Sequence, residues 1–174
     1  MTADVKRHIS MHPADRYKKL CEGAAESSKG FLDRRARRKR AAATVAKLMA
    51  EYLGMPNGGA TVVEVDSNLR AKGERRPIGA DINLQPGDDG LWYFGLDLHF
   101  EKPSTSHFGG VTLYIGVDVS EEGLLLKHER KHRVRELSKE ALEPFMRQVY
   151  EDLLDNYSRS PSKRRSSIGF VEEG

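Results

Sequence analysis

Three segments in the middle of the chain share a glycine followed, two positions later, by an aspartate. They are Gly79-Ala80-Asp81, Gly95-Leu96-Asp97 and Gly116-Val117-Asp118. The residues beside each aspartate are apolar, so Gly and Asp share the polar face of an alternating strand. Carboxylates on one face can bind a divalent cation or a cationic group, and glycines let a ligand or another backbone approach closely.

Two tight hairpins would place Asp81 opposite Gly95 and Asp97 opposite Gly116. In this register no two carboxylates face each other directly, which avoids like-charge repulsion. Diagonal neighbours lie about 7–8 Å apart at their Cα atoms, too far for short aspartates to share a metal at about 2.0–2.6 Å. The pattern therefore favours a contact surface, and its alternative is a set of carboxylates that are solvated or paired with Lys127, Lys131 or the arginines of residues 34–40. The predicted contact residues are Asp81, Tyr93, Asp97, His99, Tyr114, Asp118 and Lys127.

The string His128-Glu129-Arg130-Lys131-His132 resembles the active-site string of zinc metallopeptidases over five residues. On a helix, His128 and His132 would lie one turn apart and bind zinc, with Glu129 as general base. Arg130 and Lys131 would then place two cations beside a dication, which is unfavourable. A strand would turn Glu129 away from both histidines. Secondary structure at residues 124–135 thus decides between a zinc site and none.

Six of the seven residues from 34 to 40 are basic. The residues are Arg34, Arg35, Arg37, Arg38, Lys39 and Arg40. On a helix they point in all directions, so they repel one another unless an anionic partner supplies counter-charge. We expect a polyanion, most readily nucleic acid; the alternatives are pairing with the acidic sheet and solvation. No aromatic residues are interleaved, so stacking on single-stranded bases is not indicated.

The elements that must position these residues follow from periodicity. Apolar residues at helical spacing and strict alternation predict helices and strands, respectively. We expect helices at 13–25 and 31–53, separated by a break at 27–30, and a long helix at 139–157 capped by Ser138. We expect strands at 61–66, 78–85, 91–101 and 111–119, and a charged edge strand at 124–135. The fold class is α+β: an antiparallel meander of four to five strands, with N-terminal helices and the long C-terminal helix on its apolar face.

Charge is distributed unevenly along the 174 residues, although the net charge is only +3. Residues 1–59 hold 13 Lys and Arg against 6 Asp and Glu, whereas residues 60–119 hold 5 against 9. We expect a flexible N-terminus at 1–11, one α+β domain at 12–157 and a disordered, basic, Ser-rich tail at 158–174. A single cysteine excludes a disulfide framework, and no apolar run is long enough for a membrane span or a signal, which favours the cytoplasm.

Taken together, the sequence predicts a non-enzymatic binding or adaptor protein without a cofactor. It would engage nucleic acid or another polyanion through residues 34–40, and a protein partner or its own copy through the sheet. The alternative is a metal-dependent hydrolase that uses either the aspartates of the sheet or the histidine string.

Overall fold

The computed structural model describes residues 12–100 and 110–158. Contacts divide the chain into two units, residues 1–35 and 36–174, and each is described by itself. The predicted flexible start at 1–11 lies outside the described residues, as does the predicted tail except for Ser158. That the domain extends as one body over 12–157 stays a prediction.

Helix α1 runs without interruption through Pro13–Tyr52, so the break predicted at 27–30 is wrong. Serine and glycine weaken a helix by up to about 1 kcal/mol each, but they leave its hydrogen bonds intact, and no proline interrupts this stretch. The first unit holds the N-terminal part of α1, with exposed side chains throughout Pro13–Lys29.

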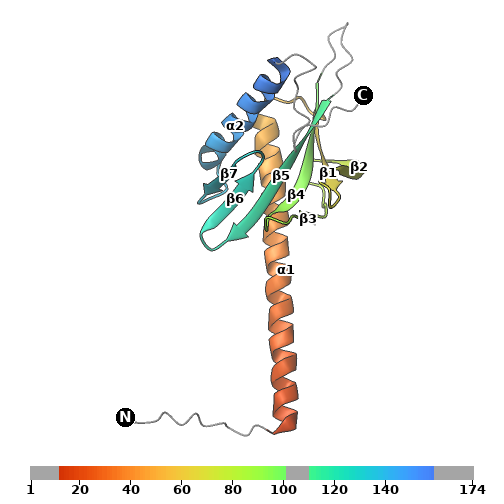
Figure 1. Cartoon of the computed structure of the whole chain (residues 1–174), viewed down its shortest axis with the longest axis vertical. Coiled ribbons are helices and arrows are strands. Elements are labelled where there is room, and N and C mark those ends of the chain that lie inside the picture. Colours follow the sequence, from red (N-terminus) through yellow and green to blue (C-terminus); the bar gives the residue numbers. More distant parts are fainter. Residues whose placement is uncertain (1–11, 101–109, 159–174) are drawn as a thin grey trace, which may run out of the picture. The chain divides into compact units, whose positions relative to one another are not determined.

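The second unit contains a seven-stranded antiparallel sheet within the described ranges (Figure 1). Its strands are β1 Ala60–Val65, β2 Ala71–Pro77, β3 Gln85–Pro86, β4 Trp92–His99, β5 Gly110–Ser120, β6 Gly123–Lys127 and β7 Lys131–Val134. Their order is β2-β1-β4-β5-β6-β7, and the short β3 pairs with β4 beyond the end of β1. The α+β class and the antiparallel sheet are confirmed; the strand count of four to five is too low.

Two predicted segments exchange their roles in the structure. No strand was predicted between residues 66 and 78, yet Ala71–Pro77 forms the edge strand β2. Residues 78–85 were expected to be a strand, yet all but Gln85 lie outside the sheet, and Gly79 has a φ of 93° that most residues avoid. Ile82 and Leu84 still reach the core, so alternation there reflected burial without strand pairing.

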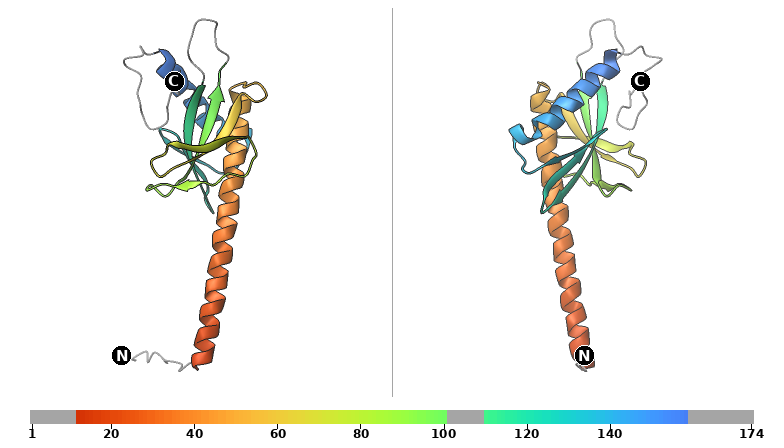
Figure 2. Two further views of the ribbon diagram at one scale, coloured as in Figure 1. Left: turned by 90° about the vertical axis from the view of Figure 1, so that its right-hand side faces the viewer. Right: turned by 60° about the vertical axis from the view of Figure 1, so that its left-hand side comes forward.

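Both helices cover one face of the sheet, as predicted. Phe94, Leu96 and Ile115 of the central strands are fully buried in one cluster with Val45 of α1 and Phe145 of α2. Figure 2 shows α2 (Lys139–Ser158) and the C-terminal turns of α1 on the same side of the strands. Ser138 caps α2 through a 3.2 Å hydrogen bond from the Ala141 N–H to its hydroxyl.

Helix α1 ends at Tyr52, one residue before the predicted end at 53, and Gly54 forms its C-terminal cap. The Met55 N–H donates to the Ala50 carbonyl at 3.0 Å, and the Gly54 N–H donates to the Glu51 carbonyl at 3.1 Å. This is a Schellman motif, which requires a left-handed residue, and Gly54 supplies it with a φ of 67°. The sharp end directs the chain into β1.

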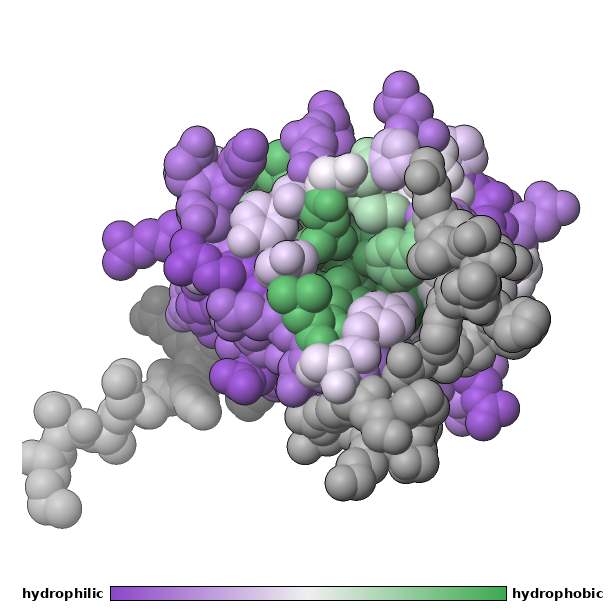
Figure 3. Space-filling view, turned by 90° about the horizontal axis from the view of Figure 1, so that it is seen from above, coloured by the Kyte–Doolittle hydropathy of each residue, from purple (hydrophilic) through white to green (hydrophobic). Residues whose placement is uncertain are grey.

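Several large apolar side chains of the second unit remain exposed. They are Phe100, Leu137, Tyr150 and Leu154. Two of them belong to the predicted apolar stripe of α2, which is therefore wider than the face that packs on the sheet. Viewed from above, apolar side chains gather in a hollow bordered by more polar ones (Figure 3).

The face opposite the helices pairs its glycines with tyrosines rather than with aspartates. Gly116 lies across from Tyr93, and Gly95 lies across from Tyr114, so the β4–β5 pairing differs by four residues from the predicted register. A Cβ on Gly116 would lie 2.9 Å from two carbons of the Tyr93 ring. A Cβ on Gly87 would lie 2.6 Å from the other edge of the same ring. The glycines therefore make room for an aromatic ring within the chain.

We predict that Gly116→Ala lowers the free energy of unfolding by about 1–3 kcal/mol, because the ring has no room to move away. Urea unfolding measures this change. In a Tyr93→Leu background the same substitution should cost less than half as much, since the contact is gone. Equal costs in both backgrounds would show that the ring does not require the glycine.

Candidate polyanion-binding surface

Arg38 fixes α1 to the sheet. Its Nε lies 2.8 Å from Oδ1 of Asp118 on β5, and its guanidinium carbon lies 4.9 Å from the ring centroid of Trp92 on β4. Only 15% of its side chain is exposed. A charge that is stacked, paired and largely buried holds elements together and is not available to a ligand.

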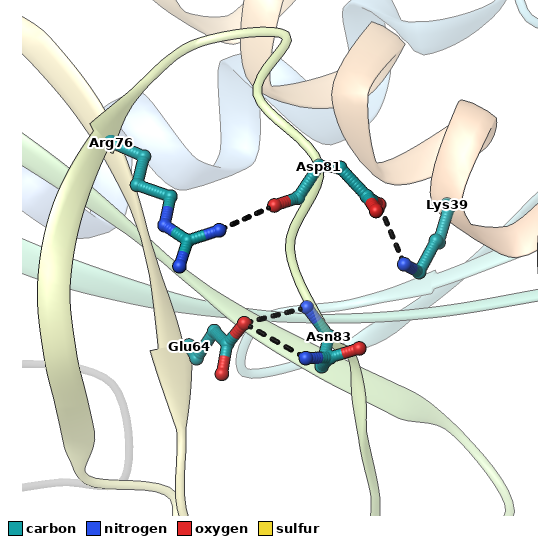
Figure 4. A network of polar contacts seen from close by, with 5 residues as sticks. All are labelled: Lys39, Glu64, Arg76, Asp81 and Asn83. Carbon is teal, nitrogen blue, oxygen red and sulfur yellow. Dashed lines mark hydrogen bonds and ion pairs between the residues drawn. The ribbon is translucent and has the colours of Figure 1, made fainter.

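Lys39, the next residue, contacts a more exposed carboxylate. Its Nζ lies 2.6 Å from Oδ1 of Asp81, whose side chain is 81% exposed, whereas 24% of the Lys39 side chain is exposed (Figure 4). From the other side, Nη1 of Arg76 on β2 donates to the backbone carbonyl of Asp81 at 2.8 Å. The loop is held further by Glu64 Oε1, which accepts from the Asn83 N–H at 2.9 Å and from its side-chain amide at 3.1 Å.

Arg37 and Arg40 complete the part of the basic run that lies in the second unit. Both are exposed, and neither has an ion pair with a carboxylate of residues 12–100 or 110–158. Arg34 and Arg35 belong to the first unit, where they are also exposed. The predicted polyanion residues thus separate into Arg38 and Lys39, which pair with carboxylates of the sheet and of a loop, and others that are exposed.

The three aspartates of the predicted contact face each have a cation from the same chain. Asp118 pairs with Arg38, one of the arginines named in the alternative of internal pairing, and Asp81 pairs with Lys39, which that alternative did not name. Asp97 is 3% exposed and accepts hydrogen bonds from the Thr112 hydroxyl and the Arg75 guanidinium. No sequence signal pointed to Arg75, because its strand was expected to be a loop.

The remaining residues of that face divide between the interior and the surface. Tyr93 and Tyr114 are buried in a small second cluster with Leu91 and Val65. His99 is exposed, and its Nε2 lies 3.3 Å from the Thr61 hydroxyl oxygen. The structure therefore does not bring the seven predicted residues into one open surface.

Lys127 contacts the carboxylate of Asp89, a pairing that the sequence did not predict. Asp89 Oδ2 lies 2.7 Å from Lys127 Nζ and accepts a 2.7 Å hydrogen bond from the Tyr93 hydroxyl. Partial burial alone would raise the pKa of Asp89, but the hydrogen bonds from Lys127, Tyr93 and the Leu91 N–H outweigh it and lower the pKa to about 2. Burial and the Asp89 carboxylate raise the pKa of Tyr93. The hydrogen bond to Asp89 raises that of Lys127.

The histidine string does not form a helix. Residues 128–130 form the bend between β6 and β7, and His132 lies in β7. His128 is buried, with Nδ1 3.3 Å from the Tyr114 carbonyl oxygen, and burial lowers its pKa. His132 contacts the Gln148 side chain through Nε2. Over the described ranges, no group of three or more His, Cys, Asp or Glu is placed to hold a metal ion.

Two cavities border the C-terminal part of α1. One, of about 190 Å³, lies between α1 and the Asp81 loop and is lined by Lys39, Arg40, Asp81, Val62 and Phe94 among others. The other, of about 340 Å³, lies beside the end of α1, where Lys47, Met55, Pro56 and Ile78 contribute to its wall.

We predict that Arg38→Gln lowers the free energy of unfolding by about 1–3 kcal/mol, because it removes both the ion pair and the stacking on Trp92. Lys39→Gln is the matched control: its partner is exposed, so the loss should stay below about 1 kcal/mol. Chemical unfolding of the two variants measures the difference. Equal losses would contradict the assignment of Arg38 as the anchor of α1.

The lowered pKa of Asp89 predicts that the free energy of unfolding depends on pH. Since its pKa falls from 3.8 to about 2 on folding, the charged form stabilises the fold above pH 4, and this contribution is lost as the pH falls through 2. Asp89→Asn should therefore cost about 1–2 kcal/mol at pH 6 and progressively less between about pH 4 and 2. Unfolding curves of both proteins at each pH test this, and the titration of His128, common to both, cancels. A constant difference would argue against the lowered pKa.

Within residues 12–100 and 110–158, no helix has the length and apolar character needed to cross a membrane. Comparisons with protein-family models, with curated proteins and with solved structures give no match, so the chain is assigned to no family.

Proposed function

We propose that this protein binds nucleic acid through the exposed arginines of its basic run, as a non-enzymatic binding protein. The observation that carries the proposal is the division within the run. Arg38 pairs with Asp118 of the sheet and Lys39 with Asp81 of the adjacent loop, whereas Arg37 and Arg40 are exposed and have no ion pair within the described residues. Charges without an internal partner repel their neighbours until an anion neutralises them.

Phosphate is the anion that these side chains suit best. Arg37 and Arg40 are three positions apart on α1, so their side chains are neighbours on one helix face. A guanidinium presents two parallel N–H donors to a phosphate, which makes arginine the usual residue for phosphate recognition. Arg34 and Arg35 precede them in the sequence and add positive charge. Their participation stays a prediction from the sequence.

The proposed binding is independent of base sequence. No aromatic side chains are interleaved in the run, so stacking on unpaired bases has no support, and contacts to the phosphate backbone remain. Such contacts release counterions, and affinity then falls steeply as salt rises.

The second part of the prediction, a protein partner or a second copy bound through the sheet, is retained in a narrower form. Asp97, Tyr93 and Tyr114 are buried, so we propose that any such contact uses the exposed His99 and the partly exposed Lys127 and Asp118. No observation favours the alternative of a metal-dependent hydrolase, because His128 and His132 contact other groups of the chain.

We predict that Arg37→Glu combined with Arg40→Glu strongly weakens salt-sensitive binding to a short labelled DNA duplex. Fluorescence anisotropy at low and moderate salt measures it. For the unmutated protein, the logarithm of the binding constant should fall linearly with the logarithm of the salt concentration. The variant should show at least a tenfold weaker affinity at low salt.

A charge-matched control separates site-specific loss from a change of net charge. Arg130 in the bend between β6 and β7 and Lys131 at the start of β7 are exposed, at the opposite edge of the sheet from β2. Arg130→Glu with Lys131→Glu should retain most of the affinity. If the unmutated protein does not bind the duplex at low salt, or if both pairs of substitutions act alike, the proposal is wrong.

A further inference from the structure

A second group of cations lies on the edge strand β2. The register places Arg76 opposite Val62 and Lys72 opposite Glu64 on β1. Residues directly opposed in an antiparallel pair share a face, and Val62 belongs to the core beneath the helices. Arg76 and Lys72 therefore lie on the helix-bearing side of the sheet. Lys72 is exposed and has no ion pair within the described residues.

The loop that carries Asp81 lies between these cations and those of α1. Lys39 contacts the Asp81 carboxylate from one side, and Arg76 donates to its backbone carbonyl from the other (Figure 4). Arg40 shares the wall of the 190 Å³ cavity with Lys39 and Asp81, so α1 and the loop border the same hollow. Basic residues of two elements thus flank one exposed carboxylate.

Asp81 is a replaceable partner for Lys39. Its side chain is 81% exposed and sits in a loop without regular secondary structure. Exposed ion pairs of this kind are weak, because water and salt screen them and both side chains lose freedom in making them. A DNA phosphodiester offers Lys39 an acceptor of equal charge, and its neighbouring phosphates add to the negative potential.

We propose that the nucleic-acid surface continues from α1 across the Asp81 loop onto β2, where Lys72 and Arg76 contact phosphates. Asp81 acts as an internal competitor that occupies Lys39 until phosphate displaces it. The inference rests on the proposed function of Arg37 and Arg40, and it adds a second contact element and an acidic residue that limits affinity.

The test uses the full chain and the same labelled DNA duplex across a salt series. Asp81→Asn should bind about two- to fivefold more tightly, because Lys39 no longer has a competing carboxylate. Asp88→Asn, an exposed aspartate in the turn before β4, is the control and should leave affinity unchanged. Adding Lys39→Gln to Asp81→Asn should remove the gain.

The β2 contacts have a separate readout. Lys72→Gln with Arg76→Gln should lower the slope of log affinity against log salt by about 0.9 for each contact removed, whereas Arg130→Gln should not change it. Thermal unfolding of every variant checks that the fold is retained. Weaker or unchanged binding by folded Asp81→Asn, or an unchanged slope for the β2 variant, would overturn this inference while leaving the role of Arg37 and Arg40 intact. Equal binding to heparin and DNA would show a general polyanion surface and overturn its assignment to nucleic acid.

Discussion

The burial of one carboxylate, that of Asp97, determines how the polar side of the sheet is built. A buried carboxylate costs several kcal/mol unless hydrogen bonds and an opposite charge compensate it. Thr112 on β5 and Arg75 on β2 provide both, and β1 lies between β2 and β4 in the sheet order. Arg75 must therefore reach over β1, which keeps the otherwise exposed β2 at the edge. Successive residues of a strand point to opposite faces, so the same constraint turns Arg76 toward the side of α1.

The basic run combines two kinds of charge that respond differently to their surroundings. Arg38 is mostly enclosed and stacked on Trp92, so salt screens its attraction to Asp118 only weakly. Arg37 and Arg40 face solvent, where screening is strong. Over a range of ionic strength that weakens every surface contact, α1 stays docked on the sheet. A helix can therefore carry many cations without being expelled from its own fold.

The core was predictable and the polar contacts were not. Alternation identified β1, β4 and β5, and helical spacing identified α2, because those segments bury one regular face. Strand β2 has no buried side chain, so its sequence resembles a loop, and its place depends on Arg75 and backbone pairing. The predicted register of β4 and β5 was wrong by four residues, since the packing of Tyr93 against Gly116 favours a pairing that alternation alone does not distinguish. The sequence allowed internal partners for the aspartates, but nothing in it indicated that Asp89 or Arg75 would form an ion pair.

Strand β2 also has a consequence for how copies of the chain behave at high concentration. A free strand edge can recruit another chain, and proteins discourage this with charged side chains and bulges. The outer strand β2 carries Lys72, Arg75 and Arg76 and a register shift near Gly73, and the opposite outer strand β7 carries Lys131 and Arg133. Like charges on the two edges oppose strand pairing between copies. An anionic ligand that neutralises β2 would remove this protection at one edge only. The same few side chains would then affect both ligand binding and the tendency of copies to aggregate.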